Sequence, residues 1–100
     1  MSGGDRPTEL ERLRAQIDAV DRSIVDAFAE RVRIARRIGD LKEEAGQPVL
    51  DPSREAAVVR RAAERAREAG LDEEAVREIF WRLVGLSRRT QREERGGTHG

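Results

Sequence analysis

The feature that most constrains this sequence is a regular apolar stripe between Thr8 and Gly46. Residues on this stripe follow one another at alternating steps of three and four, which is typical of a long, gently supercoiled helix. At about 1.5 Å per residue such a helix is about 55 Å long, whereas a compact domain of this size has a radius of gyration of about 13 Å. The rest of the chain cannot cover it, so we expect a second copy to cover the remainder. We call this stripe the seam: Leu10, Leu13, Ile17, Val20, Ile24, Ala27, Arg31, Ile34, Ile38, Leu41 and Ala45.

Start and stop residues predict three helices, over 8–46, 52–69 and from 72 to beyond 91. The first begins at a capping box formed by Thr8 and Glu11, and each of the other two follows an aspartate. Glycine or a Gly–Gln–Pro sequence ends the first two helices. Because no strand pattern and no internal repeat is present, the sequence predicts an all-α fold with a long first helix.

The chain is long enough for one small domain, which we place at residues 8–92 between a disordered N-terminal segment, 1–7, and a disordered tail, 93–100. A small hydrophobic core usually needs further stabilisation from disulfides, a bound metal or a second subunit. Cys is absent and the single histidine, His99, has no second ligand near it in the sequence, so neither a disulfide nor a metal is expected. Oligomerisation is then the remaining way to enlarge the core.

Charge and composition exclude several classes of function. Twenty basic residues balance 20 acidic ones, so no net field would attract nucleic acid or an anionic membrane. Three aromatic residues are too few for a base-stacking surface. The chain has no signal sequence and no apolar run of about 18 residues. We therefore expect a cytoplasmic protein without nucleic-acid or membrane partners.

Cations stand on or beside the seam. Arg31 is the one seam residue that is charged, and a guanidinium in a packed surface needs a partner. Lys42 is the only lysine, and its Cα lies about 16 Å further along the same helix face, so both side chains could reach one small anion. Plainer interpretations stay open. Arg31 could pair with a carboxylate of the second helix, Lys42 could hold a solvated head on a snorkelling stem, and Arg14 could be an ordinary surface arginine.

A second polar group lies in the other two helices. Asp51, Arg54 and Glu55 cluster where free N–H groups and the helix dipole favour an anion. Capping explains Asp51 and the dipole explains Glu55, but Arg54 opposes the dipole. Ser87 and Gln91 continue the inward stripe of the third helix, where they need hydrogen-bond partners if buried and none if the helix end is solvated.

Taken in chain order, these residues resemble the all-helical chorismate mutases. The resemblance spans residues 10–91 without a gap between motifs. Members of that family are intertwined homodimers with three helices per chain, and they rearrange chorismate to prephenate on the way to phenylalanine and tyrosine. The motifs are L-R-x-x-I-x-x-[IV]-D at 13–21, A-E-R at 29–31, G-x-x-K at 39–42, P-V-x-D-x-x-R-E at 48–55 and S-x-x-x-Q at 87–91.

The resemblance implies a role for each of these polar residues. It implies that Arg31 and the partner subunit's Arg14 bind the two substrate carboxylates, with help from Ser87. Lys42 and Gln91 are implied to donate hydrogen bonds to the ether oxygen of the substrate. The carboxylates and the ether oxygen would thus all be held by donors.

The resemblance also implies that Arg54 lies beside this cluster and that Glu55, with the backbone at Asp51, holds the ring hydroxyl.

The conversion of chorismate to prephenate is a Claisen rearrangement. Such a reaction is pericyclic, so it needs no nucleophile, proton transfer, metal or cofactor, and we expect none. Its barrier depends on the conformation of the substrate and on the charge that develops at the ether oxygen.

Distance along the first helix predicts shared active sites. Arg14 and Arg31 lie about 25 Å apart on one helix, so they cannot bind one small substrate from the same chain. In an antiparallel homodimer, Arg14 of each subunit would reach its partner's site.

Alternatives on the same fold are 4-amino-4-deoxychorismate mutase and isochorismate-pyruvate lyase. Glu55 and Ser87 favour a mutase over the lyase, but an amine on the ring would also suit Glu55. An alternative of another class is a non-catalytic helical dimerisation module. A larger enzyme of the pathway could bind the surface, although no motif marks such a partner.

Overall fold

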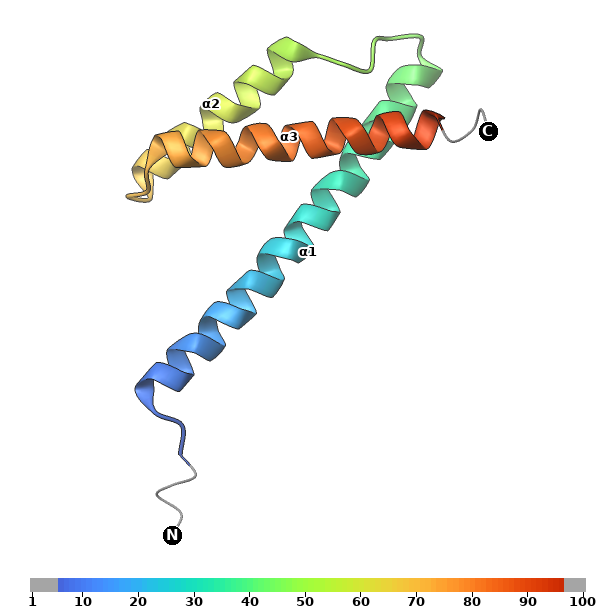
Figure 1. Ribbon diagram of the computed structural model, residues 1–100. Coiled ribbons are helices and arrows are strands. Elements are labelled where there is room, and N and C mark those ends of the chain that lie inside the picture. Colours follow the sequence, from blue (N-terminus) through green and yellow to red (C-terminus); the bar gives the residue numbers. More distant parts are fainter. Residues whose placement is uncertain (1–5, 97–100) are drawn as a thin grey trace. The chain divides into compact units, whose positions relative to one another are not determined.

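The computed structural model describes residues 6–96, and the side chains of residues 6–89. Three helices make up this part of the chain: α1 (Glu9–Glu44), α2 (Pro52–Glu68) and α3 (Glu73–Gly96) (Figure 1). The prediction of an all-α fold with a long first helix is confirmed. Helix α3 continues past Gln91, whose side chain lies outside the described residues, as does His99. The division into 1–7, 8–92 and 93–100 stays a prediction.

The predicted N-terminal caps are formed by side-chain hydrogen bonds. The Thr8 amide donates to Glu11 Oε1 at 2.8 Å, and the Glu11 amide donates to Thr8 Oγ1 at 3.1 Å, which completes the capping box. Before α2, Asp51 Oδ1 accepts from the Arg54 amide at 3.1 Å. Before α3, Asp72 Oδ1 accepts two backbone N–H groups in the same way. Local sequence therefore fixes where each helix begins.

Glycines end the first two helices. Gly46 has φ of 71° and Gly70 has φ of 76°, in the left-handed region that only glycine adopts without a steric penalty. Gly70 lies in the turn that leads into α3. These two positions explain why neither helix continues into the next.

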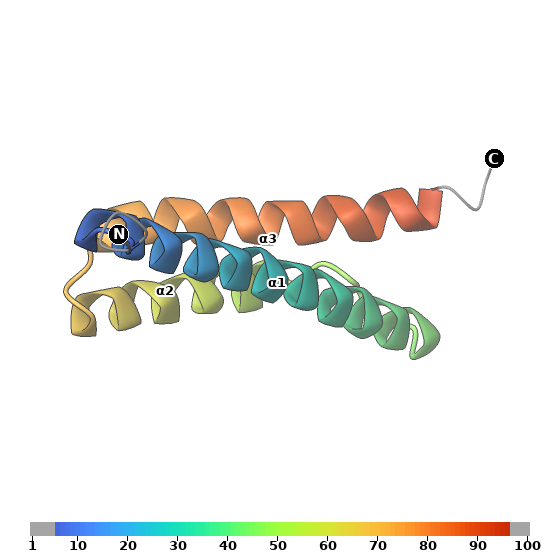
Figure 2. The same cartoon turned by 90° about the horizontal axis from the view of Figure 1, so that it is seen from below.

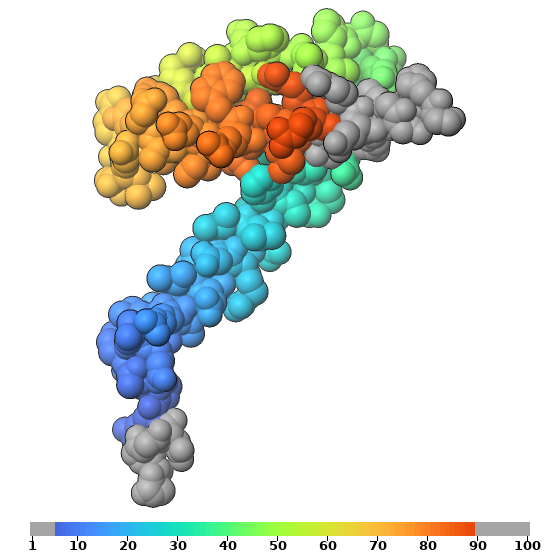
Figure 3. Space-filling model, in the orientation of Figure 1, coloured from blue at the N-terminus to red at the C-terminus, as the bar shows by residue number. Residues whose placement is uncertain are grey.

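Contacts divide the chain into two units, Met1–Glu30 and Arg31–Gly100. In the second unit α2 and α3 pack against each other and run in opposite directions from the turn that joins them (Figures 1 and 2). Their side chains meet beside this turn (Figure 3).

The core of the second unit is small. Its buried apolar residues are mostly alanines, and among the described residues no large side chain is fully buried. Alanines let two helices approach closely, but they remove little apolar surface from water. The core therefore supplies limited stabilisation. Its apolar members are Val59, Ala62, Ala63, Ala66 and Val84.

The large apolar residues of the seam are exposed in both units. In the first unit their exposed fractions run from 46% for Leu13 to 60% for Ile17. In the second unit Ile34, Ile38 and Leu41 are 47% to 50% exposed. Within the described residues no helix is long and apolar enough to cross a membrane. The seam is thus an apolar surface that the single chain leaves open to water.

Candidate active site

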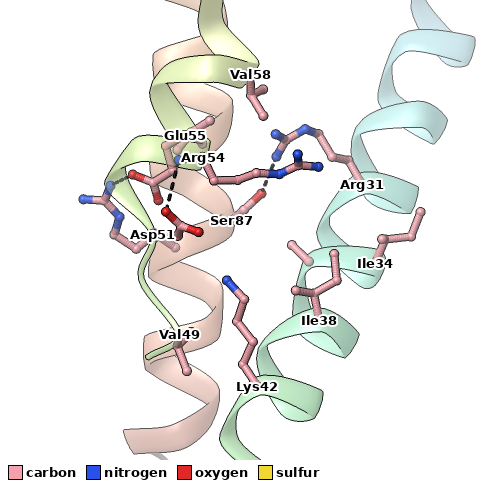
Figure 4. A pocket seen from close by; sticks show the side chains of 13 residues that line it. Arg31, Ile34, Ile38, Lys42, Val49, Asp51, Arg54, Glu55, Val58 and Ser87 are labelled. Carbon is pink, nitrogen blue, oxygen red and sulfur yellow. Dashed lines mark hydrogen bonds and ion pairs between the residues drawn. The ribbon is translucent and has the colours of Figure 1, made fainter. Parts of the chain in front are cut away.

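A pocket of about 510 Å³ lies in the second unit, between the C-terminal half of α1, the segment before α2, and α2 and α3 (Figure 4). Its volume falls within the range of about 300–1,000 Å³ that is usual for small-molecule sites. Aliphatic side chains of all these segments line part of its wall. Its polar and charged lining residues are Arg31, Lys42, Asp51, Arg54, Glu55, Ser87 and Arg88.

The pocket brings together six of the residues singled out from the sequence. Arg14 belongs to the first unit, where it is exposed. The side chain of Gln91 lies outside the described residues. Residues 31 to 87 of the predicted site thus come from one unit. They are Arg31, Lys42, Asp51, Arg54, Glu55 and Ser87.

Arg31, the cation on the seam, forms a hydrogen bond with a residue of α3. Its Nη1 donates to Ser87 Oγ at 3.1 Å, and Ser87 is only 7% exposed. Among the described side chains this partner is a hydroxyl, not the carboxylate of α2 that the plainer interpretation proposed. The hydroxyl carries no charge, so this hydrogen bond does not neutralise Arg31. The Ser87 hydroxyl also keeps its own proton for a second acceptor, so the pair offers several donors to one anion.

Two further cations extend into the pocket from facing elements. Figure 4 shows the Lys42 side chain of α1 and the Arg54 side chain of α2 directed into the space between these helices. Lys42 is half-buried, whereas Arg54 is exposed. A solvated head on a snorkelling stem would also leave Lys42 half-buried, so both interpretations of this lysine stay open.

The opposite charge in the pocket comes from the start of α2. The Asp51 carboxylate caps the helix, which occupies one of its oxygens. Glu55 Oε1 accepts a hydrogen bond from Arg88 Nη2, and the two side chains form an ion pair between α2 and α3. The Glu55 side chain is 17% exposed and that of Arg88 is 36% exposed.

Arg88 is the pocket residue that the sequence analysis missed. It follows Ser87 directly and lies four residues after the buried Val84, so it shares the inward face of α3. That spacing was the available signal. Among 19 arginines, however, nothing else distinguishes it.

The net charge of the lining suits a small dianion. Four cations and two carboxylates line the pocket, which leaves a formal excess of two positive charges. Among the described residues, no group of three His, Cys, Asp or Glu side chains could hold a metal ion. The arrangement can bind carboxylates, donate hydrogen bonds to a developing anion and accept one from a hydroxyl or an amine.

The fold and this pocket define an all-helical protein with a cavity whose charged lining suits a small anion. Over residues 13–92 the sequence matches the family described as chorismate mutase type II. The chain belongs to this family, and the expectation that followed from its motifs is confirmed.

Three relatives illustrate the range of the family. The chain is 42% identical over 65 residues to the 4-amino-4-deoxychorismate mutase of Streptomyces venezuelae, covering 65% of this chain and 63% of that protein. It is 29% identical over 85 residues to the chorismate mutase of Methanocaldococcus jannaschii, covering 85% and 86%. It is 43% identical over 47 residues to the bifunctional chorismate mutase/prephenate dehydratase of Aquifex aeolicus, covering 47% and 13%. The chain thus spans less than two thirds of the first and the last of these proteins.

Proposed function

We propose that this chain catalyses the rearrangement of chorismate to prephenate without a cofactor. The observation that carries the proposal is the pocket itself, where Arg31, Lys42 and Arg54 line one cavity with the Glu55 carboxylate in a member of this family. Its formal excess of two positive charges equals the charge of the two substrate carboxylates. Binding in such a pocket holds the substrate in the compact form that the pericyclic step requires.

Each polar residue has a proposed part in that step. Arg31 and Ser87 bind one carboxylate. Lys42 donates to the ether oxygen, where negative charge grows as the C–O bond breaks, and a preorganised donor stabilises that charge. Gln91, four residues after Ser87 on α3, is proposed as a second donor to the same oxygen. Because such a donor faces the oxygen where charge develops, it binds the transition state more strongly than the substrate.

The ring hydroxyl is proposed to bind at the start of α2. Glu55 accepts its hydrogen bond, and the backbone at Asp51 lies one helical turn before Glu55. Arg54 lies next to both and lines the same pocket. This arrangement would orient the ring relative to the carboxylates.

We also propose that the active protein is an antiparallel homodimer with two shared sites. The exposed seam supports this proposal, because residues such as Leu13, Ile17 and Ile38 leave about half of their surface in water. Seventeen residues separate Arg14 from Arg31 on α1, about 25 Å along the axis. The partner subunit's Arg14 would therefore complete each site.

The cellular setting is likewise proposed. A charged metabolite as substrate suits a protein of the cytoplasm. A larger enzyme of the same pathway is a proposed partner, and the bifunctional relative from Aquifex aeolicus supports this, since its name joins two activities in one protein.

A second candidate function is the mutase reaction on 4-amino-4-deoxychorismate, which the name of the relative from Streptomyces venezuelae favours. The test is to incubate the purified chain with each compound and to follow the loss of substrate absorbance, with products identified by NMR. Prephenate from chorismate supports the proposal. Pyruvate and salicylate from isochorismate would indicate the lyase. A folded dimer inactive on all three compounds would indicate a dimerisation module.

A further inference from the structure

The Glu55–Arg88 ion pair is the one charged contact in the pocket that the proposed reaction does not use. Arg88 Nη2 donates to Glu55 Oε1. Among the described residues no hydrogen bond to the other oxygen, Oε2, is present, so one carboxylate oxygen stays free for a ligand. Glu55 is thus a hydrogen-bond acceptor whose negative charge is already paired with the positive charge of Arg88.

This countercharge changes what the carboxylate can bind. An unpaired carboxylate attracts a cation more strongly than a neutral donor, whereas the pair with Arg88 has no net charge. A hydroxyl can donate to Oε2 without adding charge to the site. A protonated amine at the same place would lie within a few ångströms of the guanidinium, and the like charges would repel each other.

Burial makes this repulsion effective. The Glu55 side chain is 17% exposed and that of Arg88 is 36% exposed, so water screens the charges only in part. Arg88 Nε is buried and has no hydrogen-bond partner among the described residues. An unsatisfied buried donor opposes stability, so the position of Arg88 is not explained by stability alone.

We propose that Arg88 is a positioning residue that sets substrate preference, making the Glu55 subsite select a ring hydroxyl over a ring amine. The inference rests on the proposed function and commits it to chorismate over 4-amino-4-deoxychorismate. The two compounds differ, as the name of the second says, by an amine in place of the 4-hydroxyl group. Alkyl amines are mostly protonated at neutral pH, so this difference is one of charge.

The test compares kcat/KM for the two compounds at pH 7 in the full chain. The wild type should prefer chorismate. In Arg88→Met the ratio of the amino compound to chorismate should rise at least about tenfold, equivalent to about 1.4 kcal/mol. Arg88→Lys keeps the charge and should keep the ratio. The matched control is Arg89→Met, which removes an exposed arginine one residue away and should change neither rate.

A pH series gives a readout that a purely structural role would not move. Between pH 7 and 9 the amine loses part of its proton. In the wild type the Glu55–Arg88 pair has no net charge, so the relative rate on the amino compound should change little with pH. In Arg88→Met the relative rate should fall with pH, because deprotonation removes the attraction to an unpaired Glu55. Circular dichroism checks that the variants are folded, and Arg88→Gln replaces Arg88→Met if that variant unfolds.

Distinct results separate the two levels of the proposal. A ratio within twofold of wild type in folded Arg88→Met overturns the role of Arg88. A wild-type preference for the amino compound overturns it too, as does a relative rate of the wild type that falls with pH. All three leave the mutase function standing. A wild-type chain inactive on both compounds overturns the proposed function, and this inference with it.

Discussion

Replacing Ser87 by alanine tests whether α3 positions Arg31, the arginine of α1 that we propose to bind a substrate carboxylate. Ser87 Oγ accepts from Arg31 Nη1 at 3.1 Å and is almost fully buried. A hydrogen bond to a charged group contributes about 1.5–3 kcal/mol, and about 1.4 kcal/mol is tenfold. We therefore expect kcat/KM on chorismate to fall about 10- to 100-fold in Ser87→Ala. The free energy of unfolding should fall by no more than about 1.5–3 kcal/mol, because water in the open pocket can replace Ser87 as the partner of Arg31.

The assay is steady-state loss of chorismate absorbance, with thermal unfolding measured beside it. Ser53→Ala is the matched control, since Ser53 is exposed on the first turn of α2 and does not line the pocket. If Ser87 acts through Arg31, the substitution should have little further effect in an Arg31→Ala background. Two losses that simply add, or a loss below threefold in Ser87→Ala alone, would refute this reasoning.

Three further predictions concern the remaining donors. Lys42→Ala and Lys42→Arg should each lose about 10²–10³ in kcat with the dimer intact, because arginine keeps the charge but not the compact donor geometry; a near wild-type rate in Lys42→Arg would remove Lys42 from the ether-oxygen role. Gln91→Glu should gain activity as pH falls, because a carboxyl group donates only when protonated, and a profile parallel to wild type would place Gln91 outside the site. Arg14→Ala and Lys42→Ala, unfolded together and refolded in equal amounts, should recover roughly a quarter of wild-type activity by random pairing. No recovery in mixed dimers confirmed by mass would exclude shared sites.

The helices were predictable because their signals are local. A capping residue such as Thr8 or Asp51 acts within one turn of its helix, and Gly46 ends α1 through its own backbone conformation. The seam was predictable for the same reason, because its period depends on one helix only. What covers the seam is not set by such local signals, and we propose that it is a second copy of the chain.

Part of the site was predictable because Arg31 interrupts the apolar seam and Lys42 comes directly after the seam residue Leu41. The partner of Arg31 was not, since pairing with Ser87 depends on how α1 and α3 are set within the second unit. The Glu55–Arg88 pair was missed for a similar reason. It joins residues 33 positions apart, and the rotation of α3 against α2 that brings them together is fixed by alanine packing, not by a motif.

The alanine core between α2 and α3 has a consequence for how such a protein is handled. It buries so little apolar surface that one chain has few means of staying folded by itself. If the seam is covered by a second copy, as proposed, folding and assembly become one equilibrium that depends on concentration. Dilution then acts as a denaturant. A low specific activity at low enzyme concentration would report dissociated chains, and rates for different variants are comparable only where each is held above its own dissociation constant.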